Sequence, residues 1–599
     1  MIGAVELGLI YGLMALGVYL TFRILDFADL TIDSSFTTGA AACAVVILGG
    51  GSPWLGTLAG FAVGLIAGLI TGLLNTAGKI HPLLAGILPQ IGLYSVNLRI
   101  MGKSNLPFRR EESLFTPLRE ANLVGTWVSV AILLVVLLVA CGIVVWFLST
   151  NLGLALRATG DNEEMARAQG VNTDLAKLIG LALSNGLVAL SGSLIAQYQG
   201  FADISMGIGL IIAGLASVII GTAVIPTGRI WMAVLAVVGG SVVYRVIIQA
   251  ALMIPGFNPN DMKLLSAIIV VVFLIAPRWK GFLSWQKNHP IAEFSGVQPW
   301  DTADAEELDS GDTRPADKNI TKRTRRKGIS SRMGKTTVEL SHISKAFFRH
   351  TVNEKIALRD ISLQLDEGDF VTVIGSNGAG KSTLLNIVSG RYRPDLGQIH
   401  IDGHDVTRKP DYKVARYVGR VFQDPMAGTC PHMTIEENLA IAWARTHGHG
   451  LGLGVTRARK AQFREDLKVL EQGLENRLTA RVGLLSGGQR QALSLVMAVF
   501  TQPKILLLDE HTAALDPARA ELITRLTQEL VARHGLTTLM VTHNMEQALH
   551  LGNRLIMMHE GEVIMELSGK DKENATVDDL LAQFAKFKGA ALSDRTMLS

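Results

Sequence analysis

Residues 375–383 read GSNGAGKST, a glycine-rich stretch that ends in a lysine and two hydroxyl side chains. From Gly375 to Ser382 the stretch fits the pattern G-x-x-x-x-G-K-[ST]. The apolar segment FVTVI (370–374) precedes it, and the helical pattern KSTLLNIVSG (381–390) follows it. Strand, glycine loop and helix in this order predict a phosphate-binding loop, because backbone amides and a helix N-terminus attract phosphate oxygens.

The loop predicts a site for ATP and Mg²⁺. We expect Lys381 to reach the β and γ phosphates and the Ser382 hydroxyl to hold Mg²⁺. The residues expected around the phosphates are Gly375, Ser376, Asn377, Gly378, Ala379, Gly380, Lys381, Ser382 and Thr383.

Two further stretches in the same half carry polar groups that suit this site. ILLLDE (505–510) reads as a buried strand that ends in two acids, an arrangement that is costly unless something charged is bound there. Asp509 is expected to hold Mg²⁺, and Glu510 is placed as the general base for the attacking water. LSGGQ (485–489) reads as a helix start with Ser486 as its N-cap.

The first half of the chain has a different character. The 599 residues are 49% hydrophobic and only 18% charged, and the deficit of charge lies before about residue 277. A membrane span needs about 20 apolar residues. The candidate spans are 2–22, 36–50, 54–76, 83–101, 126–150, 176–198, 206–225, 230–252 and 262–276. The second candidate is short, and we expect it to be re-entrant or broken. The number of spans is therefore eight or nine, and the N-terminus can lie on either side of the membrane.

The sequence therefore predicts a membrane-embedded all-α bundle followed by an α/β nucleotide-binding domain. The predicted parts are a permease domain (1–280), a flexible charged linker (281–335), an ATP-binding domain (336–570) and a tail with a short helix (571–599). The net charge of +4 is small for this length and gives no case for nucleic acid as a partner. The three cysteines have no metal or disulfide spacing and are expected to be buried thiols.

Two helical features within the first half bear on packing and on contact with the ATPase. Glycines 60, 64, 68 and 72 form a stripe at i, i+4 spacing, which predicts close helix packing inside the bundle. Residues 151–175 lie on the same side of the membrane as the ATP-binding domain, since four spans separate them. In this loop, Asp161 and Glu164 have the spacing of a capping box and Gly170 suits a helix stop, so a short helix is predicted between them.

The order of these motifs resembles the nucleotide-binding domain of ATP-binding cassette (ABC) transporters. The resemblance covers residues 337–569 and rests on SKAFF, GSNGAGKST, VFQD, LSGGQ, ILLLDE, AALD and VTHN. It implies that Phe347 stacks on adenine, that Gln423 is the Q-loop residue and a Mg²⁺ ligand, and that His543 is the switch histidine. It makes Lys381, Gln423, Glu510 and His543 the catalytic set.

The resemblance also implies a dimer, in which each ATP lies between the phosphate loop of one chain and the LSGGQ of the other. The γ-phosphate contacts in the opposite site would come from Ser486, Gly487, Gly488 and Gln489, with Asp516 as the D-loop residue. A homodimer is the simplest arrangement. Two departures are His511, where proline is commoner, and RQALSLVMAVF (490–500), which lacks the usual arginine-rich pattern. Neither removes a catalytic group, so a competent ATPase is expected.

The first half resembles the permeases of branched-chain amino acid and ribose importers, here fused to their ATPase. The likeness rests on residues 8–40 and on GLALRATGDNEEMARAQGVNTD (153–174). It implies import of a small polar solute such as an amino acid, a separate extracytoplasmic binding protein, and residence in the inner membrane with the ATPase in the cytoplasm. The alternatives are an ABC exporter and a membrane ATPase sensor that transports nothing.

Polar side chains within apolar spans are candidates for the substrate path. Arg23 and Asp26 are three apart and are expected to pair on one helix face. The full candidate set is Arg23, Asp26, Asp29, Asp33, Asn185 and Arg245. Hydrogen bonding within the bundle is the competing interpretation for each of these residues.

Overall fold

The structure is a computed structural model that describes residues 1–225, 229–255, 258, 261–262, 264–273, 275 and 335–588. Apart from Lys335, the predicted linker lies outside the described residues, and so does the end of the tail from residue 589.

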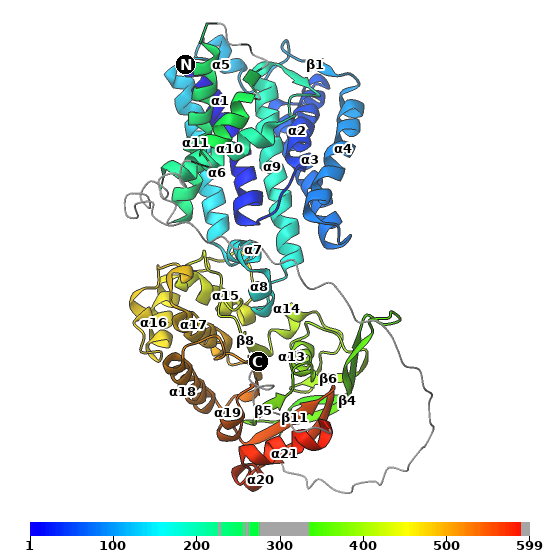
Figure 1. Ribbon diagram of the computed structural model, residues 1–599. Helices are drawn as coiled ribbons and strands as arrows, with labels where there is room; N and C mark the ends of the chain where they lie inside the picture. Colours follow the sequence, from blue (N-terminus) through cyan, green and yellow to red (C-terminus); the bar gives the residue numbers. More distant parts are fainter. Residues whose placement is uncertain are drawn as a thin grey trace, which may run out of the picture. The chain divides into compact units, whose positions relative to one another are not determined.

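Apolar helices make up most of the first half (Figure 1). Within the described ranges, 7 helices are long and apolar enough to cross a membrane. They are α1 (Ile2–Tyr19, continued by a π-helical turn Leu20–Ile24), α2 (Thr31–Leu48), α3 (Pro53–Thr76), α4 (Pro82–Met101), α6 (Trp127–Ser149), α9 (Thr173–Gln199) and α11 (Ile230–Leu252). Two shorter apolar helices are α10 (Leu210–Val224) and Leu264–Phe273. The predicted helical bundle is confirmed. The second candidate span, which was expected to be re-entrant or broken, is instead one continuous helix, α2.

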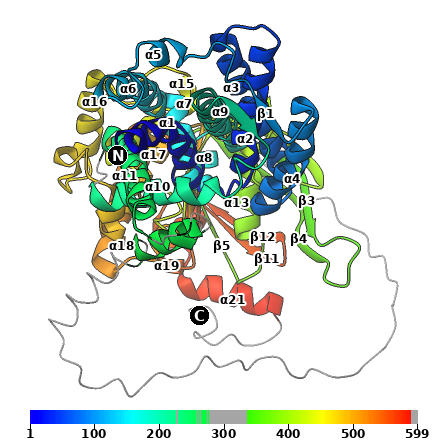
Figure 2. The same cartoon turned by 90° about the horizontal axis from the view of Figure 1, so that it is seen from above.

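Helix α9 packs against α1, α2 and α3, and the view from above shows it among them (Figure 2). The glycine stripe of α3 makes this packing possible. A Cβ atom on Gly68 would lie 2.2 Å from the Leu181 carbonyl oxygen, and one on Gly64 would lie 2.5 Å from the Asn185 carbonyl oxygen. Both carbonyls belong to α9, so the predicted role of the stripe in packing within the bundle is confirmed.

Short elements connect the spans. Strands β1 (Asn105–Pro107) and β2 (Phe201–Asp203) pair antiparallel, and α5 (Thr116–Glu120) follows β1. Helices α7 (Asn151–Asp161) and α8 (Glu163–Ala168) follow α6. A Cβ on Gly160 of α7 would touch the carbonyl oxygen of Ile24, so α7 lies at the end of α1 that is farthest from Met1.

The C-terminal half contains two sheets. The six-stranded sheet has the order β12-β11-β5-β10-β9-β8, in which β11, β5, β10, β9 and β8 run parallel. Its strands are β5 (Phe370–Gly375), β8 (Val418–Val421), β9 (Ile505–Asp509), β10 (Thr537–Val541), β11 (Arg554–His559) and β12 (Glu562–Ser568). The antiparallel sheet β4-β3-β6-β7 contains β3 (Thr336–Phe347), β4 (Lys355–Asp366), β6 (Leu396–Ile401) and β7 (His404–Asp405).

Helices cover these sheets and carry several of the motifs. They are α13 (Lys381–Val388), α14 (Asp411–Val414), α15 (Ile435–His447), α16 (Arg457–Lys468), α17 (Gly487–Val499), α18 (Pro517–His534), α19 (Met545–His550), α20 (Lys570–Glu573) and α21 (Val577–Lys588), with single 3₁₀ turns at Leu474–Asn476 and Val482–Leu484. Helix α21 buries Leu580 and Phe584 in a cluster with β11, so this helix of the predicted tail packs against the sheet. The three cysteines are buried, as expected.

The contact between α3 and α9 generates a stability prediction. Gly68→Ala places a methyl group against a backbone carbonyl that cannot move without displacing α9, so we expect a loss of about 1–3 kcal/mol or more. Thermal unfolding of the detergent-solubilised chain measures the change. Gly92→Ala on α4 is the control, because a Cβ there meets nothing within 4 Å. Equal melting temperatures for the two variants would contradict the packing.

Candidate nucleotide site and its contact with the membrane helices

The phosphate loop joins β5 to α13 and depends on glycine at two positions. Gly378 and Gly380 have φ angles of +79° and +98°, and a Cβ on Gly380 would lie 2.4 Å from the Ala357 carbonyl oxygen. Other residues rarely adopt such angles. The loop therefore turns tightly and leaves its backbone amides and the start of α13 directed to one place, as phosphate binding requires.

Lys381 and eleven neighbouring residues line a cavity of about 240 Å³. The cavity is lined by Phe347, Lys355, Ala357, Asn377, Gly378, Ala379, Gly380, Lys381, Ser382, Thr383, Glu510 and His543. The Lys381 Nζ donates to the carbonyl oxygens of Gly375 (2.7 Å) and Ser376 (3.2 Å). Burial lowers the pKa of Lys381, while the Glu510 and Asp509 carboxylates oppose that shift. A desolvated lysine ammonium in this position suits a phosphate group.

Glu510 has two neighbours that the sequence singled out. Its Oε1 lies 2.6 Å from the His543 Nε2, and its Oε2 accepts from the Gln423 Nε2 at 3.3 Å. Burial raises the pKa of Glu510, against the opposing effect of His543 and Lys381. A carboxylate with a raised pKa is a stronger proton acceptor. The structure thus brings Lys381, Gln423, Glu510 and His543 together.

The donor set for a cation also fits. The Ser382 hydroxyl, the Asp509 carboxylate and the Gln423 amide supply the oxygen ligands that Mg²⁺ prefers. Ser382 lines the cavity, and Asp509 ends β9 directly before Glu510. Phe347 lines the same cavity and packs edge-on against Tyr392, with ring centroids 5.3 Å apart.

The LSGGQ residues lie at a different cavity of about 260 Å³, which shares no lining residue with the first. Ser486 caps α17: its Oγ accepts from the Gln489 N, and the Gln489 Oε1 accepts from the Ser486 N at 3.1 Å. Ser486, Gly488 and Gln489 line this cavity, while Asp516 caps α18 nearby. His511 is buried, and its Nε2 lies 3.0 Å from the Thr527 hydroxyl. This contact connects the residue after Glu510 to α18, the helix that Asp516 caps.

The short helix predicted after residue 161 is α8, but its cap differs from the prediction. Asn162, not Asp161, is the N-cap and accepts from the Met165 N at 3.0 Å. Asp161 is the last residue of α7, and its Oδ2 instead accepts from the His432 N at 3.0 Å. Gly170 follows with a left-handed φ of +80°, as its predicted role as a stop requires.

Helices α7 and α8 join the ATP-binding domain through charged and apolar contacts that the sequence did not reveal. Arg157 and Glu437 form two hydrogen bonds, at 2.8 and 3.2 Å. Burial alone would raise the pKa of Glu437, but Arg157 and Thr434 outweigh it and lower the pKa. The Asn162 amide donates to three carbonyls in the segment 426–429.

Apolar side chains from both halves of the chain form one buried cluster at this contact. Leu154 and Met165 of α7 and α8 lie in the same cluster as Ile435 and Leu439 of α15. The glycine-rich loop 450–454 adds backbone bonds, from the Asn151 N to the Gly452 carbonyl and from the Leu152 N to the Gly450 carbonyl. Buried apolar contacts and backbone hydrogen bonds therefore connect the two domains, in addition to the ion pairs.

The substrate-path candidates fall into separate environments. Asp29 is buried and accepts from the Thr31 N (2.9 Å) and the Asn185 Nδ2 (2.6 Å). Asp33 accepts from the backbone of Gly209 and Ile211, at the start of α10.

Arg23 and Asp26 behave differently from the prediction. The helix ends at Ile24, and Asp26 lies beyond it with a φ of +51°, so the two side chains do not share a helix face. Both are exposed. No ion pair joins them within the described part of the chain. The pairing predicted from their spacing is wrong.

Two further intramembrane groups stand out. The guanidinium carbon of Arg245 lies 3.5 Å from the centroid of the Tyr11 ring, which itself stacks on Phe36. Glu6 is buried, and its carboxylate accepts from the Tyr198 hydroxyl at 2.7 Å and from the Gly125 N at 2.8 Å. No role was predicted for Glu6 from the apolar run 2–22 in which it lies. Its position within that apolar run was the available signal.

Comparison with known proteins gives a separate match for each half. A family model described as ABC transporter matches residues 358–513, and one described as branched-chain amino acid transport system / permease component matches residues 1–276. A tyrosine transport ATP-binding protein of Clostridioides difficile is 44% identical over 248 residues, which are 41% of this chain and 98% of that protein. A tyrosine transport system permease protein of the same organism is 41% identical over 267 residues, 44% of this chain and 87% of that protein.

Among solved structures, a dimeric ATP-binding cassette in a post-hydrolysis state bound to ADP and Pi is similar over 39% of this chain and 98% of that one. It is 31% identical, with a TM-score of 0.34.

The geometry around Glu510 predicts the effect of removing its charge. Glu510→Gln keeps the shape of the side chain but cannot accept a proton, so we expect ATP hydrolysis to fall by about 10²- to 10⁴-fold while ATP binding persists. Steady-state phosphate release and binding of labelled ATP measure the two quantities. Glu529→Gln, on the exposed face of α18, is the matched control. Full turnover in Glu510→Gln would show that another group is the base.

Proposed function

The chain belongs to the ABC transporters, with a permease of the branched-chain amino acid type fused to its ATPase, and from this premise we propose that two copies import an amino acid, tyrosine in the first instance, by hydrolysing ATP. One observation carries the proposal. The two halves are similar, over 87% and 98% of the relatives' lengths, to the permease and the ATP-binding protein of tyrosine transport in one organism. A single solute therefore accounts for both halves.

The proposed ATP site uses the residues that converge on the cavity. Lys381 and the amides of residues 377–380 bind the phosphates, and Phe347 contacts adenine. Ser382, Asp509 and Gln423 hold Mg²⁺, which supplies neutralisation of phosphate charge. Glu510 accepts the proton of the attacking water, and His543 holds Glu510 in place.

The separation of the two cavities supports a pair of chains. In one chain, the residues of LSGGQ line a cavity of their own and do not line the cavity around Lys381. A second copy that turns its LSGGQ toward this phosphate loop completes the site. We propose a homodimer in which Ser486, Gly487, Gly488 and Gln489 contact the γ-phosphate held by the partner copy.

The transport path follows from the position of α7 and α8. These helices contact the ATPase at the end of the bundle opposite Met1. With the ATPase in the cytoplasm, the N-terminus lies on the outer side of the inner membrane. We assign substrate delivery on that side to a separate binding protein.

Arg245 is the residue we propose to meet the solute. Its guanidinium lies on the aromatic pair of Tyr11 and Phe36, and no carboxylate pairs with it among the described residues. A cation within a span is costly without a counter-charge. The carboxylate of an amino acid supplies that charge. Asp29 and Asn185, bound to each other, are proposed to keep α2 and α9 together beside the path.

Transport in vesicles tests the direction and the solute together. The chain is reconstituted with ATP sealed inside, and labelled tyrosine is added outside with the extracytoplasmic protein fraction of the host. We expect tyrosine to accumulate inside, and Glu510→Gln to abolish it. Loss of preloaded tyrosine to the outside would instead indicate an exporter. Arg245→Gln should raise the half-saturating tyrosine concentration about tenfold, because one charged contact to a carboxylate is lost.

Mixing two inactive chains tests the shared site. Lys381→Ala and Ser486→Arg each inactivate both sites of a homodimer. In a mixed dimer, one site combines the intact Lys381 of one chain with the intact Ser486 of the other, so we expect ATP hydrolysis to reappear on co-reconstitution. Recovery measured against the separately assayed variants is the readout. Hydrolysis by Ser486→Arg alone at the normal rate would contradict the dimeric site.

A further inference from the structure

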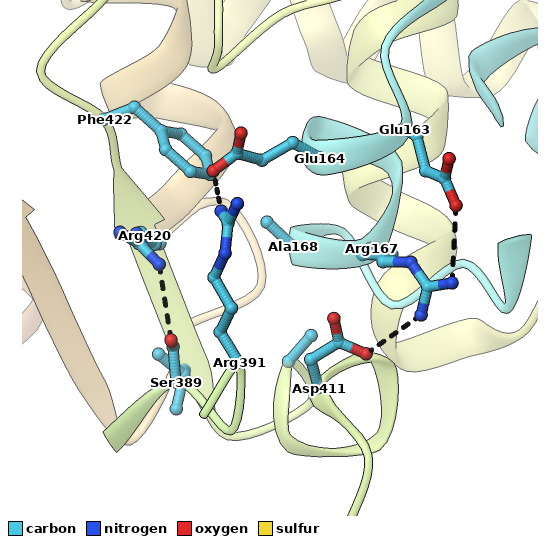
Figure 3. A pocket seen from close by; sticks show the side chains of 11 residues that line it. Glu163, Glu164, Arg167, Ala168, Ser389, Arg391, Asp411, Arg420 and Phe422 are labelled. Carbon is cyan, nitrogen blue, oxygen red and sulfur yellow. Dashed lines mark hydrogen bonds and ion pairs between the residues drawn. The ribbon is translucent and has the colours of Figure 1, made fainter. Parts of the chain in front are cut away.

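A cleft of about 320 Å³ lies between α8 and the ATPase, along β8. Figure 3 shows its lining side chains. Glu164 and Ala168 of α8 face Ser389, Arg391, Arg420 and Phe422 of the ATPase across it. The proposed function gives no role to Arg420, although this residue is buried and charged.

Arg420 reaches the proposed Mg²⁺ carboxylate from inside the sheet. Strands β8 and β9 run parallel with Arg420 opposite Leu507, so Asp509, two residues later, points to the same face. The Arg420 Nη2 lies 3.3 Å from the Asp509 Oδ2. A buried guanidinium is costly unless it is paired, so this contact is a condition for placing Arg420 here.

The same guanidinium also binds the turn at the end of α13. Its Nη1 donates to the Asn386 Oδ1 at 2.8 Å and to the Ser389 Oγ at 3.3 Å. Its Nε has no hydrogen-bond partner among the described residues. Charge-assisted bonds are commonly 2.7–2.9 Å long. The bonds to Asp509 and Ser389, at 3.3 Å, are longer than this range, and the Nε donor is used by neither of them.

The turn that binds Arg420 is itself tied to the membrane half. Arg391, two residues after Ser389, forms an ion pair with Glu164 of α8. Helix α8 is fixed in turn to the span α9, because Arg167 pairs with Asp174 and Glu163 pairs with Lys177. A displacement of α9 thus moves Glu164, and the cleft leaves room for the turn to follow.

We propose that Arg420 is a positioning residue that links α8 to the Mg²⁺ site: α8 moves the turn 386–391 through Glu164 and Arg391, and the turn sets how Arg420 holds Asp509. The proposal rests on the proposed ATPase function. It means that the state of the permease alters how well the site binds Mg²⁺. In the same segment Phe422 lines the cleft and Gln423 donates to Glu510, so Asp509 and Glu510 are both held from one short stretch.

The Mg²⁺ dependence of ATP hydrolysis tests the link in the full-length, reconstituted chain. Arg420→Met keeps the length of the side chain and removes its charge. We expect the half-saturating Mg²⁺ concentration to rise about tenfold or more, as for other groups that orient a metal ligand. Binding of labelled ATP without Mg²⁺ should not change. Arg420→Lys retains the positive charge, but its single amino group can bind fewer of the partners of Arg420. We therefore expect an intermediate rise in the half-saturating Mg²⁺ concentration.

A double-mutant cycle tests the connection to α8. Glu164→Gln should raise the half-saturating Mg²⁺ concentration two- to fivefold in the otherwise unchanged chain, and should have no further effect in Arg420→Lys. Glu529→Gln is the matched control, because it makes the same chemical change on the exposed face of α18, at a residue that does not line the cleft. It should leave the Mg²⁺ dependence unchanged.

The outcomes separate this proposal from the proposed function. An unaltered Mg²⁺ dependence in both Arg420 variants, with normal hydrolysis, would overturn the role of Arg420. Equal effects of Glu164→Gln in both backgrounds would overturn its link to α8. An unsubstituted chain that hydrolyses no ATP would instead overturn the proposed function.

Discussion

The contact of α7 and α8 with the ATPase is the constraint on which the rest of the molecule depends. A movement of the ATPase changes the arrangement of the membrane helices only if the two domains are rigidly connected. Leu154 and Met165 are buried against the ATPase, and the Arg157–Glu437 pair adds a polar contact beside them. A partly buried pair with two parallel bonds resists sliding better than an exposed one, since fewer water molecules compete for its partners.

Charge is distributed in the ATPase so that its site is incomplete without phosphate. The Lys381 Nζ is desolvated and donates to two carbonyl oxygens, while Glu510 contacts Gln423 and His543. The Lys381 ammonium is more stable once the ATP phosphates supply the opposite charge. The second cavity, at LSGGQ, has its helix start already capped by Ser486. Its backbone amides are thus presented without further rearrangement.

The sequence was most informative where a motif is a continuous local structure. The phosphate loop, the buried strand at 505–509 and the glycine stripe were predicted because their pattern depends on neighbouring residues alone. Contacts between distant segments were not: nothing local shows that Arg157 meets Glu437 or that Arg420 meets Asp509. Local rules also failed where two residues compete for one task. Asp161 and Asn162 both have side chains that can cap a helix. Asn162 is the N-cap of α8, because α7 continues through Asp161.

The membrane half uses acidic side chains where helices begin inside the bundle. Asp29 binds the backbone at the start of α2, and Asp33 binds the backbone at the start of α10. Free amides at a helix start attract negative charge, and lipid offers no water to satisfy them. These carboxylates therefore stabilise the starts of the two helices whether or not a solute is bound. Among the described residues Arg245 bonds to no backbone group, which is why it, rather than the aspartates, is the stronger candidate for contact with a transported carboxylate.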